Sequence, residues 1–200
     1  METIPITTPD QPITYFGVAY VFSQADNQRF QHIVDLLHSN LSDLAYLAPS
    51  PYRHITIAGI TSVSETRADK PLLDFMHLHK QEIEDVLDEA SSTTPRFTVN
   101  FTQLEVHKRA IILRAEDSQQ MAGLRSKLHN LPTLNAHINQ PNFVHTSIAR
   151  YKQTLPIERI SQITSGIEFS IRLTIDTISL VYASSSFSNA QEIMTERRLR

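Results

Sequence analysis

The sequence has no cysteine among its 200 residues. This absence excludes disulfide bonds, thiolate metal sites and cysteine nucleophiles, so any catalysis must use oxygen and nitrogen groups. Long apolar runs are also missing, since no stretch approaches the roughly 20 residues that a membrane-spanning helix needs. The N-terminus has no basic residue before Arg29 and therefore resembles neither a secretory signal nor a transit peptide. We expect a cytoplasmic protein that does not enter a membrane.

An excess of basic residues is missing as well. The chain has 18 Lys and Arg against 21 Asp and Glu, which gives a formal net charge of −3. This balance argues against binding to long duplex nucleic acid, whereas a small anionic ligand or a nucleic-acid end fits it. With 40% hydrophobic residues, the chain is large enough to bury a core without disulfides or a structural metal. We expect a single domain over residues 1–200, and a monomer.

Segments rich in aromatic and β-branched residues predict strands along the whole chain. The predicted strands cover 15–22, 52–60, 96–106, 110–115, 142–151 and, as one or two strands, 168–183. The short polar connection between 96–106 and 110–115 predicts a β-hairpin. This hairpin and the closely spaced final strands argue against a purely parallel sheet, so the predicted fold class is α+β.

Between these strands, apolar residues recur at helical spacing. The predicted helices cover 30–41, 71–90, 117–131 and 155–163. Pro71 suits the first turn of the second helix, and a capping box of Asp117 and Gln120 opens the third. Residues 186–200 are expected to form a serine-rich loop and a mobile or helical tail.

Two of the predicted strands carry a histidine that is followed two residues later by a hydroxyl side chain. The segments are HITIA from His54 and HTSIA from His145. Side chains at i and i+2 of a strand point to the same face, about 7 Å apart, so His54 shares a face with Thr56 and His145 shares one with Ser147. Each strand can therefore hold the core with its apolar face and present an imidazole and a hydroxyl on the other.

The bare pattern His-x-Ser/Thr is short enough to occur by chance, and the signal lies in its repeated context. His145 follows His54 by 91 residues, and Leu124 in the third predicted helix follows Ile33 in the first by the same interval. The order strand, helix, histidine strand thus occurs twice. It indicates a weak internal duplication, with halves of about 13–95 and 96–185.

With these motifs, the chain resembles the 2H phosphoesterases, a family named for two His-x-Thr/Ser motifs on strands of a duplicated α+β fold. The resemblance covers about residues 13–183 and includes the strand YFGVAYVF, the hairpin near 97–115 and the end pattern F-x-I-x-L-x-I-x-x-I-x-L-V-Y. It implies two pseudo-symmetric lobes, each a small antiparallel sheet with outer helices, and a central cleft that holds both motifs. The chain departs mildly from the family pattern, since the second motif has polar Thr146 at its centre and ends in Ser147.

The resemblance implies a metal-independent phosphodiesterase that hydrolyses 2′,3′-cyclic or 2′-5′ phosphodiesters of nucleotides or short RNA ends, with no cofactor. His54 and His145 would serve as general acid and base, and Thr56 and Ser147 would bind phosphate oxygens. Two imidazoles suit these roles because their ordinary pKa, about 6.5, allows one to be neutral and one protonated near neutral pH. On family analogy His145 deprotonates water and His54 protonates the departing ribose oxygen, and the reverse order stays open.

Side chains beside the motifs are further candidates for substrate contact. By strand alternation Tyr52 and Phe143 share the faces of the two motif histidines, so either ring can contact a base. Arg53 should point away from that face, while Arg150 is a candidate for meeting a phosphate. His77 and His79 form a His-x-His pattern, but on the predicted helix their side chains point about 200° apart, so no metal site is expected.

Three alternatives to this function remain open. The same machinery can act on another phosphodiester, or the cleft can bind a nucleotide or RNA end without catalysis. Retention of both imidazoles and both hydroxyls argues against the binding module, because binding alone requires no matched acid and base. The third alternative is an interaction protein whose histidines are structural.

Overall fold

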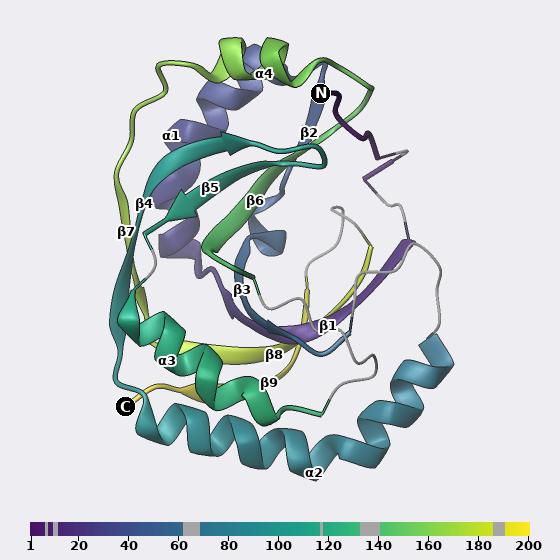
Figure 1. The fold of residues 1–200 in the computed structure, drawn as a ribbon, viewed down its shortest axis with the longest axis vertical. Helices are drawn as coiled ribbons and strands as arrows, with labels where there is room; N and C mark the ends of the chain where they lie inside the picture. Colours follow the sequence, from purple (N-terminus) through teal and green to yellow (C-terminus); the bar gives the residue numbers. More distant parts are fainter. Residues whose placement is uncertain (7, 10–11, 62–68, 117, 133–140, 186–190) are drawn as a thin grey trace.

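Two antiparallel sheets form the framework of the protein (Figure 1). The computed structural model describes all residues except 7, 10, 11, 62–68, 117, 133–140 and 186–190. The first sheet has the strand order β3-β1-β8-β9, and the second has the order β2-β6-β5-β4-β7. The strands are β1 (Pro12–Val21), β2 (Ala45–Leu47), β3 (His54–Gly59), β4 (Phe97–Val106), β5 (Ile111–Ala115), β6 (Val144–Tyr151), β7 (Ile171–Ile175), β8 (Thr177–Ser185) and β9 (Glu192–Arg198).

Helices cover the outside of both sheets. The α-helices are α1 (Gln24–Leu41), α2 (Asp69–Thr93), α3 (Gln119–Lys127) and α4 (Ile157–Thr164), and short 3-10 turns are η1 (Ser50–Tyr52) and η2 (Leu128–Asn130). α2 contacts β8 and β9, and α3 contacts β3, so both lie along the first sheet (Figure 1). α1 contacts β2 and β7, and α4 contacts β4, so both lie along the second. This arrangement confirms the predicted α+β class with two antiparallel sheets and outer helices.

The first helix shows how local sequence and core packing agree. Ser23 caps α1 through a capping box with Asp26, whose backbone N–H donates to Ser23 Oγ at 3.1 Å. The apolar stripe predicted for this helix is buried, and Phe30 is fully so. Its ring stacks on Phe22 at 5.0 Å and meets Phe101 of β4 edge-on at 5.6 Å. The two sheets therefore share one hydrophobic core through α1.

Each sheet draws strands from both halves of the sequence. β2 belongs to the first half but pairs with β6 in the second sheet, and β8 belongs to the second half but pairs with β1 in the first sheet. The predicted duplication into 13–95 and 96–185 thus stays a hypothesis about the sequence. In space, each sheet contains strands from both halves of the sequence, and the two sheets form one unit.

The prediction of a mobile or helical tail is wrong for residues 192–198, which form β9 along β8. β9 forms because the outer edge of β8 offers unpaired backbone groups, and Arg197 of β9 forms an ion pair with Asp88 of α2. The predicted cap of the third helix is also wrong: Asp117 lies outside the described residues, and the cap is Ser118, which accepts from the Met121 N–H at 3.1 Å. Strand β2 was not predicted, because three residues carry too little periodicity.

In the part of the chain that the structure describes, no helix is long and apolar enough to cross a membrane. Within the same residues, no group of three or more His, Asp or Glu side chains is placed to hold a metal ion. His77 and His79 lie on α2 as predicted, where His77 is exposed and His79 Nδ1 pairs with Glu82 Oε2 at 2.9 Å.

Candidate active site

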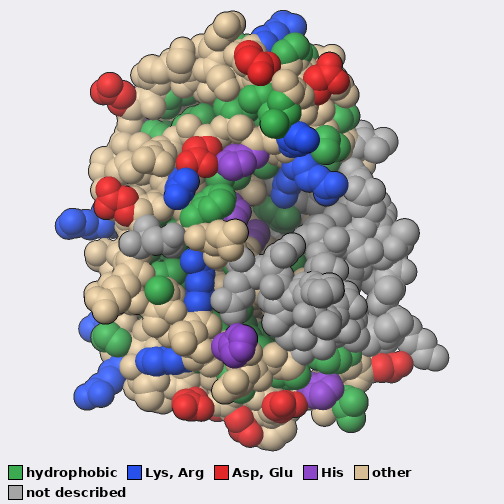
Figure 2. All heavy atoms as spheres, viewed as in Figure 1, with side chains coloured by type: hydrophobic (Ala, Val, Ile, Leu, Met, Phe, Trp, Pro, Cys, Tyr) green, Lys and Arg blue, Asp and Glu red, His purple; other side chains and the backbone are tan. Residues whose placement is uncertain are grey.

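The two motif strands lie next to each other although they belong to different sheets. Residues of β3, at the edge of the first sheet, contact residues of β6 in the second (Figure 1). Strand alternation holds in both: the buried residues are Ile55, Ile57, Val144, Thr146 and Ile148, and the partly exposed ones are His54, Thr56, His145 and Ser147. We call the space onto which these four partly exposed side chains face the cleft. Figure 2 shows a hollow in this face of the molecule, with histidine side chains at its rim and Lys or Arg side chains beside it.

A β-bulge follows the hydroxyl residue in both motifs. In the pairing of β1 with β3, Thr56 lies opposite Ala19 and Ala58 opposite Val18, so Ile57 has no partner. In the pairing of β5 with β6, Ser147 lies opposite Ile112 and Ala149 opposite Ile111, so Ile148 is skipped in the same way. A bulge increases strand twist and reverses the facing of the residues that follow it. The segments HITIA and HTSIA therefore share a backbone irregularity as well as the spacing of histidine and hydroxyl residue.

The second bulge brings Arg150 to the cleft. Strict alternation from His145 would place residue 150 on the opposite face, but the extra residue in β6 restores it to the motif side. The positive charge of Arg150 lowers the pKa of both His54 and His145, which places the guanidinium near both imidazoles. Its Nη1 donates to the Arg109 carbonyl oxygen at 3.2 Å.

Both imidazoles are oriented by a backbone carbonyl two residues earlier. His54 Nδ1 lies 2.8 Å from the Tyr52 carbonyl oxygen, and His145 Nδ1 lies 3.5 Å from that of Phe143. A carbonyl oxygen only accepts, so Nδ1 carries the hydrogen in this arrangement and Nε2 keeps its lone pair. Each Nε2 is then the nitrogen that can take a proton from a nucleophile.

Gln191, just before β9, lies against the first imidazole. Its buried amide nitrogen lies 2.7 Å from Nδ1 and 3.2 Å from Nε2 of His54. An amide N–H only donates and Nδ1 already carries a hydrogen, so the ring atom that accepts from Gln191 is Nε2. Gln191 Oε1 is buried and has no hydrogen-bond partner among the described residues. The Gln191 side chain therefore packs against one side of the His54 ring.

Burial sets the protonation of the pair. It lowers the pKa of His54 to about 4, with the Tyr52 carbonyl acting in the opposite direction and His145 and Arg150 adding to the decrease. Burial also lowers the pKa of His145 below its usual value, opposed by the Phe143 carbonyl and assisted by nearby cationic groups. Both imidazoles are therefore neutral at pH 7 in the unliganded protein. The effect of His145 on His54 also shows that the two rings are close enough to interact.

The two residues before the first motif, Tyr52 and Arg53, are both buried. Tyr52 is 6% exposed, and its ring meets the His54 ring edge-on at 5.6 Å. The predicted contact of Tyr52 with a base stays a prediction. Arg53 points away from the cleft as predicted, because its guanidinium donates to the Ala48 carbonyl at 3.1 Å and to Asn27 Oδ1 at 3.2 Å.

Phe143 is half-buried beside the second motif and belongs to an ordered cluster. Its ring lies 5.0 Å from the His145 ring, and the Arg114 guanidinium lies 4.8 Å from its centre. Glu105 holds this cluster together, since it accepts from Arg114 at 3.0 Å and pairs with His107 at 2.8 Å. Phe143 is therefore a fixed aromatic surface next to His145.

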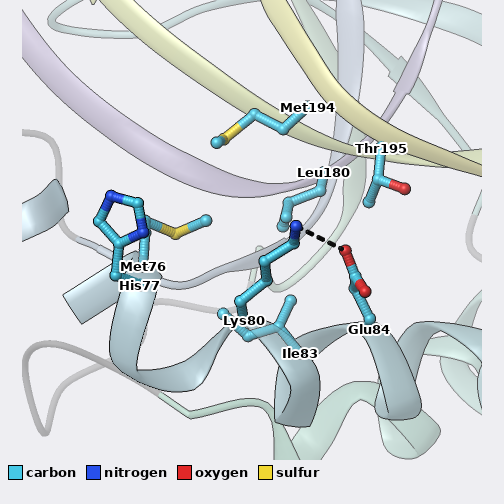
Figure 3. Close-up of a pocket in the computed structure, with 8 residues that line it drawn as sticks. All are labelled: Met76, His77, Lys80, Ile83, Glu84, Leu180, Met194 and Thr195. Atoms are coloured by element: carbon cyan, nitrogen blue, oxygen red, sulfur yellow. Dashed lines mark ion pairs between the residues drawn. The ribbon is translucent and has the colours of Figure 1, made fainter. Parts of the chain in front are cut away.

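A second concavity lies between α2 and the strands β8 and β9, away from the motifs (Figure 3). It encloses about 280 Å³ and is lined by Met76, His77, Lys80, Ile83, Glu84, Leu180, Met194 and Thr195. In Figure 3, His77 lies apart from the ion pair of Lys80 and Glu84, whose charged atoms are 4.0 Å apart. None of the motif residues lines this pocket, so it is separate from the cleft. The candidate active site is the cleft, because both histidine–hydroxyl motifs face it.

Sequence reasoning did not single out two residues that the fold brings to His54. Tyr15 of β1 has its ring centre 6.4 Å from that of His54, and Gln191 comes from 137 residues further along the chain. The alternation of Tyr15, Gly17 and Ala19 in YFGVAYVF was a signal for Tyr15, because it places one tyrosine on a strand face whose other residues are small. No local pattern points to Gln191.

Solved structures of low sequence identity share this fold. The crystal structure of TT0787 of Thermus thermophilus matches with a TM-score of 0.63 at 14% identity, covering 93% of this chain and 98% of that chain. The crystal structure of E. coli LigT in apo form matches with a TM-score of 0.57 at 11% identity, covering 94% and 98%. LigT complexed with 3′-AMP matches with a TM-score of 0.54 at 12% identity, covering 93% and 98%. No curated protein sequence matches significantly.

Two antiparallel sheets with a histidine–hydroxyl motif on each of two neighbouring strands are the arrangement expected of a 2H phosphoesterase. The sequence profile of the 2′-5′ RNA ligase superfamily matches residues 22–186, and the chain belongs to this superfamily of 2H phosphoesterases. This confirms the resemblance predicted from the motifs. It supports a phosphoesterase-type activity for the protein.

Proposed function

We propose that the protein is a metal-independent phosphodiesterase that hydrolyses 2′,3′-cyclic or 2′-5′ phosphodiesters of nucleotides or RNA ends. The observation that carries this proposal is the matched placement of His54 and His145 on neighbouring strands, each with Nδ1 on a carbonyl and a hydroxyl two residues away. The complex of the similarly folded LigT with 3′-AMP supports a nucleotide as ligand.

The cleft contains the groups that in-line hydrolysis needs. A water oxygen attacks phosphorus while one neutral imidazole takes its proton through Nε2. The bond between phosphorus and a ribose oxygen breaks, and that oxygen takes a proton from Nε2 of the other imidazole. Thr56 and Ser147 donate to the non-bridging oxygens, and Arg150 adds a positive charge beside the phosphate.

Burial favours His54 as the base and His145 as the acid. A base must be neutral, and the pKa of about 4 keeps His54 neutral over most of the pH range. An anionic phosphate raises the pKa of both imidazoles, and the one whose pKa is lowered less gains the proton more readily. This order is the reverse of the one suggested by family analogy.

The test is hydrolysis of 2′,3′-cyclic nucleotides and 2′-5′-linked oligonucleotides in excess EDTA. Wild type is compared with His54→Ala and His145→Ala, and His32→Ala, at an exposed position on α1, is the control. We expect turnover by the wild type and the control and none by the motif variants, with all four proteins folded. Absence of turnover by the wild type on every substrate would instead favour a binding module or another phosphodiester.

A further inference from the structure

Tyr15 carries a buried hydroxyl that the scheme above does not use. Its side chain is 9% exposed, and its Oη has no hydrogen-bond partner among the described residues. Buried polar atoms in folded proteins nearly always have a partner, so an orphaned one beside a candidate active site calls for a reason. The ring lies 6.4 Å from that of His54, on the cleft side of the first sheet.

The backbone of β1 is shaped to let this side chain lie along the strand. A Cβ atom at Gly17 would come within 2.4 Å of Tyr15 Oη and 2.6 Å of the Ala58 carbonyl oxygen. Tyr15 thus crosses over Gly17 toward Ala19, with which it packs. Ala19 lies opposite Thr56 in the pairing of β1 with β3, so the phenol is directed at the first motif.

Tyr15 stays a neutral donor in this position. Burial raises its pKa to about 12, an increase that the neighbouring Thr56 hydroxyl partly offsets. The two hydroxyls are therefore close, although they are not in hydrogen-bond geometry in the unliganded protein. Hydrogen bonds of catalytic groups are often long in unliganded structures and shorten when substrate binds.

We propose that Tyr15 is a positioning residue that orients the Thr56 hydroxyl toward the substrate phosphate. This inference rests on the proposed function, because it assigns Thr56 to the phosphate. A threonine hydroxyl rotates freely and has one hydrogen to donate and two lone pairs that accept. When Tyr15 donates to one lone pair of Thr56 Oγ1, the Thr56 hydrogen is left for a phosphate oxygen. Tyr15 itself does not touch the substrate, which agrees with the inaccessibility of its Oη.

The first test is Tyr15→Phe with Tyr20→Phe as the matched control. Tyr20 lies on the opposite face of β1 and donates to Asp26 Oδ2 at 2.8 Å, away from the cleft. We expect Tyr15→Phe to lower kcat/KM about 3- to 10-fold, the effect of one neutral hydrogen bond, without destabilising the protein. Tyr20→Phe should lower the melting temperature and leave kcat/KM unchanged. Equal kcat/KM in Tyr15→Phe and wild type overturns the proposal.

The second test separates positioning from a merely structural role. In a Thr56→Val background no hydroxyl is left to orient, so Tyr15→Phe should cause no further loss of kcat/KM. In a Thr56→Ser background the loss should reappear, because serine supplies the hydroxyl again. A loss of the same size in the valine background overturns the proposal, since Tyr15 would then act independently of Thr56.

A measurement of 3′-AMP binding tests this inference without depending on the proposed hydrolysis. Calorimetric titration of wild type, Tyr15→Phe and Thr56→Val needs no turnover. Weaker binding in both variants, with no additional loss in the double variant, supports the positioning role even if none of the substrates is hydrolysed. Equal binding by wild type and Tyr15→Phe, or no binding by the wild type, overturns it.

Discussion

His54 Nδ1 lies 2.8 Å from the carbonyl oxygen of Tyr52, two residues before it in the chain, and His145 repeats this relationship with Phe143 at 3.5 Å. The carbonyl requires the tautomer with hydrogen on Nδ1, whereas free histidine in water favours hydrogen on Nε2. We therefore predict that neutral His54 is the Nδ1–H tautomer. Nitrogen-15 NMR of the imidazoles at pH 7 checks this, and Nε2–H chemical shifts for His54 would contradict the proposed orientation.

The burial of neutral His54 predicts how stability depends on pH. Its pKa is about 4 in the folded protein and about 6.5 in the unfolded chain, so the unfolded state binds a proton first as the pH falls. Stability is lost as the pH falls from about 6.5 to about 4, by roughly 3 kcal/mol from this group, and no further below that range.

His54→Gln removes this contribution and should flatten the pH dependence of the unfolding free energy between about pH 4 and 6.5. Urea unfolding at several pH values measures the difference between variant and wild type, in which the contributions of carboxylates common to both proteins cancel. Parallel curves for the two proteins would show that His54 is not buried as a neutral group.

The two-histidine scheme predicts a bell-shaped pH dependence of kcat/KM, with its maximum on the acid side of neutrality. The acid limb should lie near the His54 pKa of about 4, and the basic limb below the ordinary histidine value, since the pKa of His145 is lowered. Steady-state rates on a 2′,3′-cyclic nucleotide check this. A flat profile from about pH 5 to 9 would exclude both histidines as acid and base.

The order of acid and base can be separated with an activated substrate. A phosphodiester with a p-nitrophenolate leaving group needs no proton at the departing oxygen, so loss of the acid matters little for it. If His145 is the acid, His145→Ala should retain much more activity on this substrate than His54→Ala. The opposite ranking would assign the acid to His54, as in the family analogy.

Arg150 should contribute to substrate binding and to the pKa of both imidazoles. Arg150→Met removes a positive charge beside the phosphate, and we expect KM to rise about tenfold or more. Because this charge lowers the pKa of both histidines, the basic limb of the rate profile should move to higher pH. Arg172→Met, at an exposed position on β7, is the control and should change neither quantity.

Local sequence patterns were sufficient to predict the secondary structure of segments whose conformation depends mainly on their own residues. The 3.6-residue stripe of α1 and the alternation of His54, Ile55, Thr56 and Ile57 describe structures that each segment adopts when one face is buried. The prediction failed at β9, whose polar residues show no strand pattern of their own. That strand exists because β8 pairs with it and α2 covers it.

The sequence by itself determined the two motifs, the faces on which their side chains lie and the α+β class, because strand and helix periods are local properties. The tertiary structure decided that β3 and β6 meet, although 91 residues separate their histidines and each belongs to a different sheet. It also decided that a bulge turns Arg150 to the cleft and that Tyr15 and Gln191 lie against His54. These features depend on pairing and packing between distant segments, and a single sequence carries no local pattern that fixes such contacts.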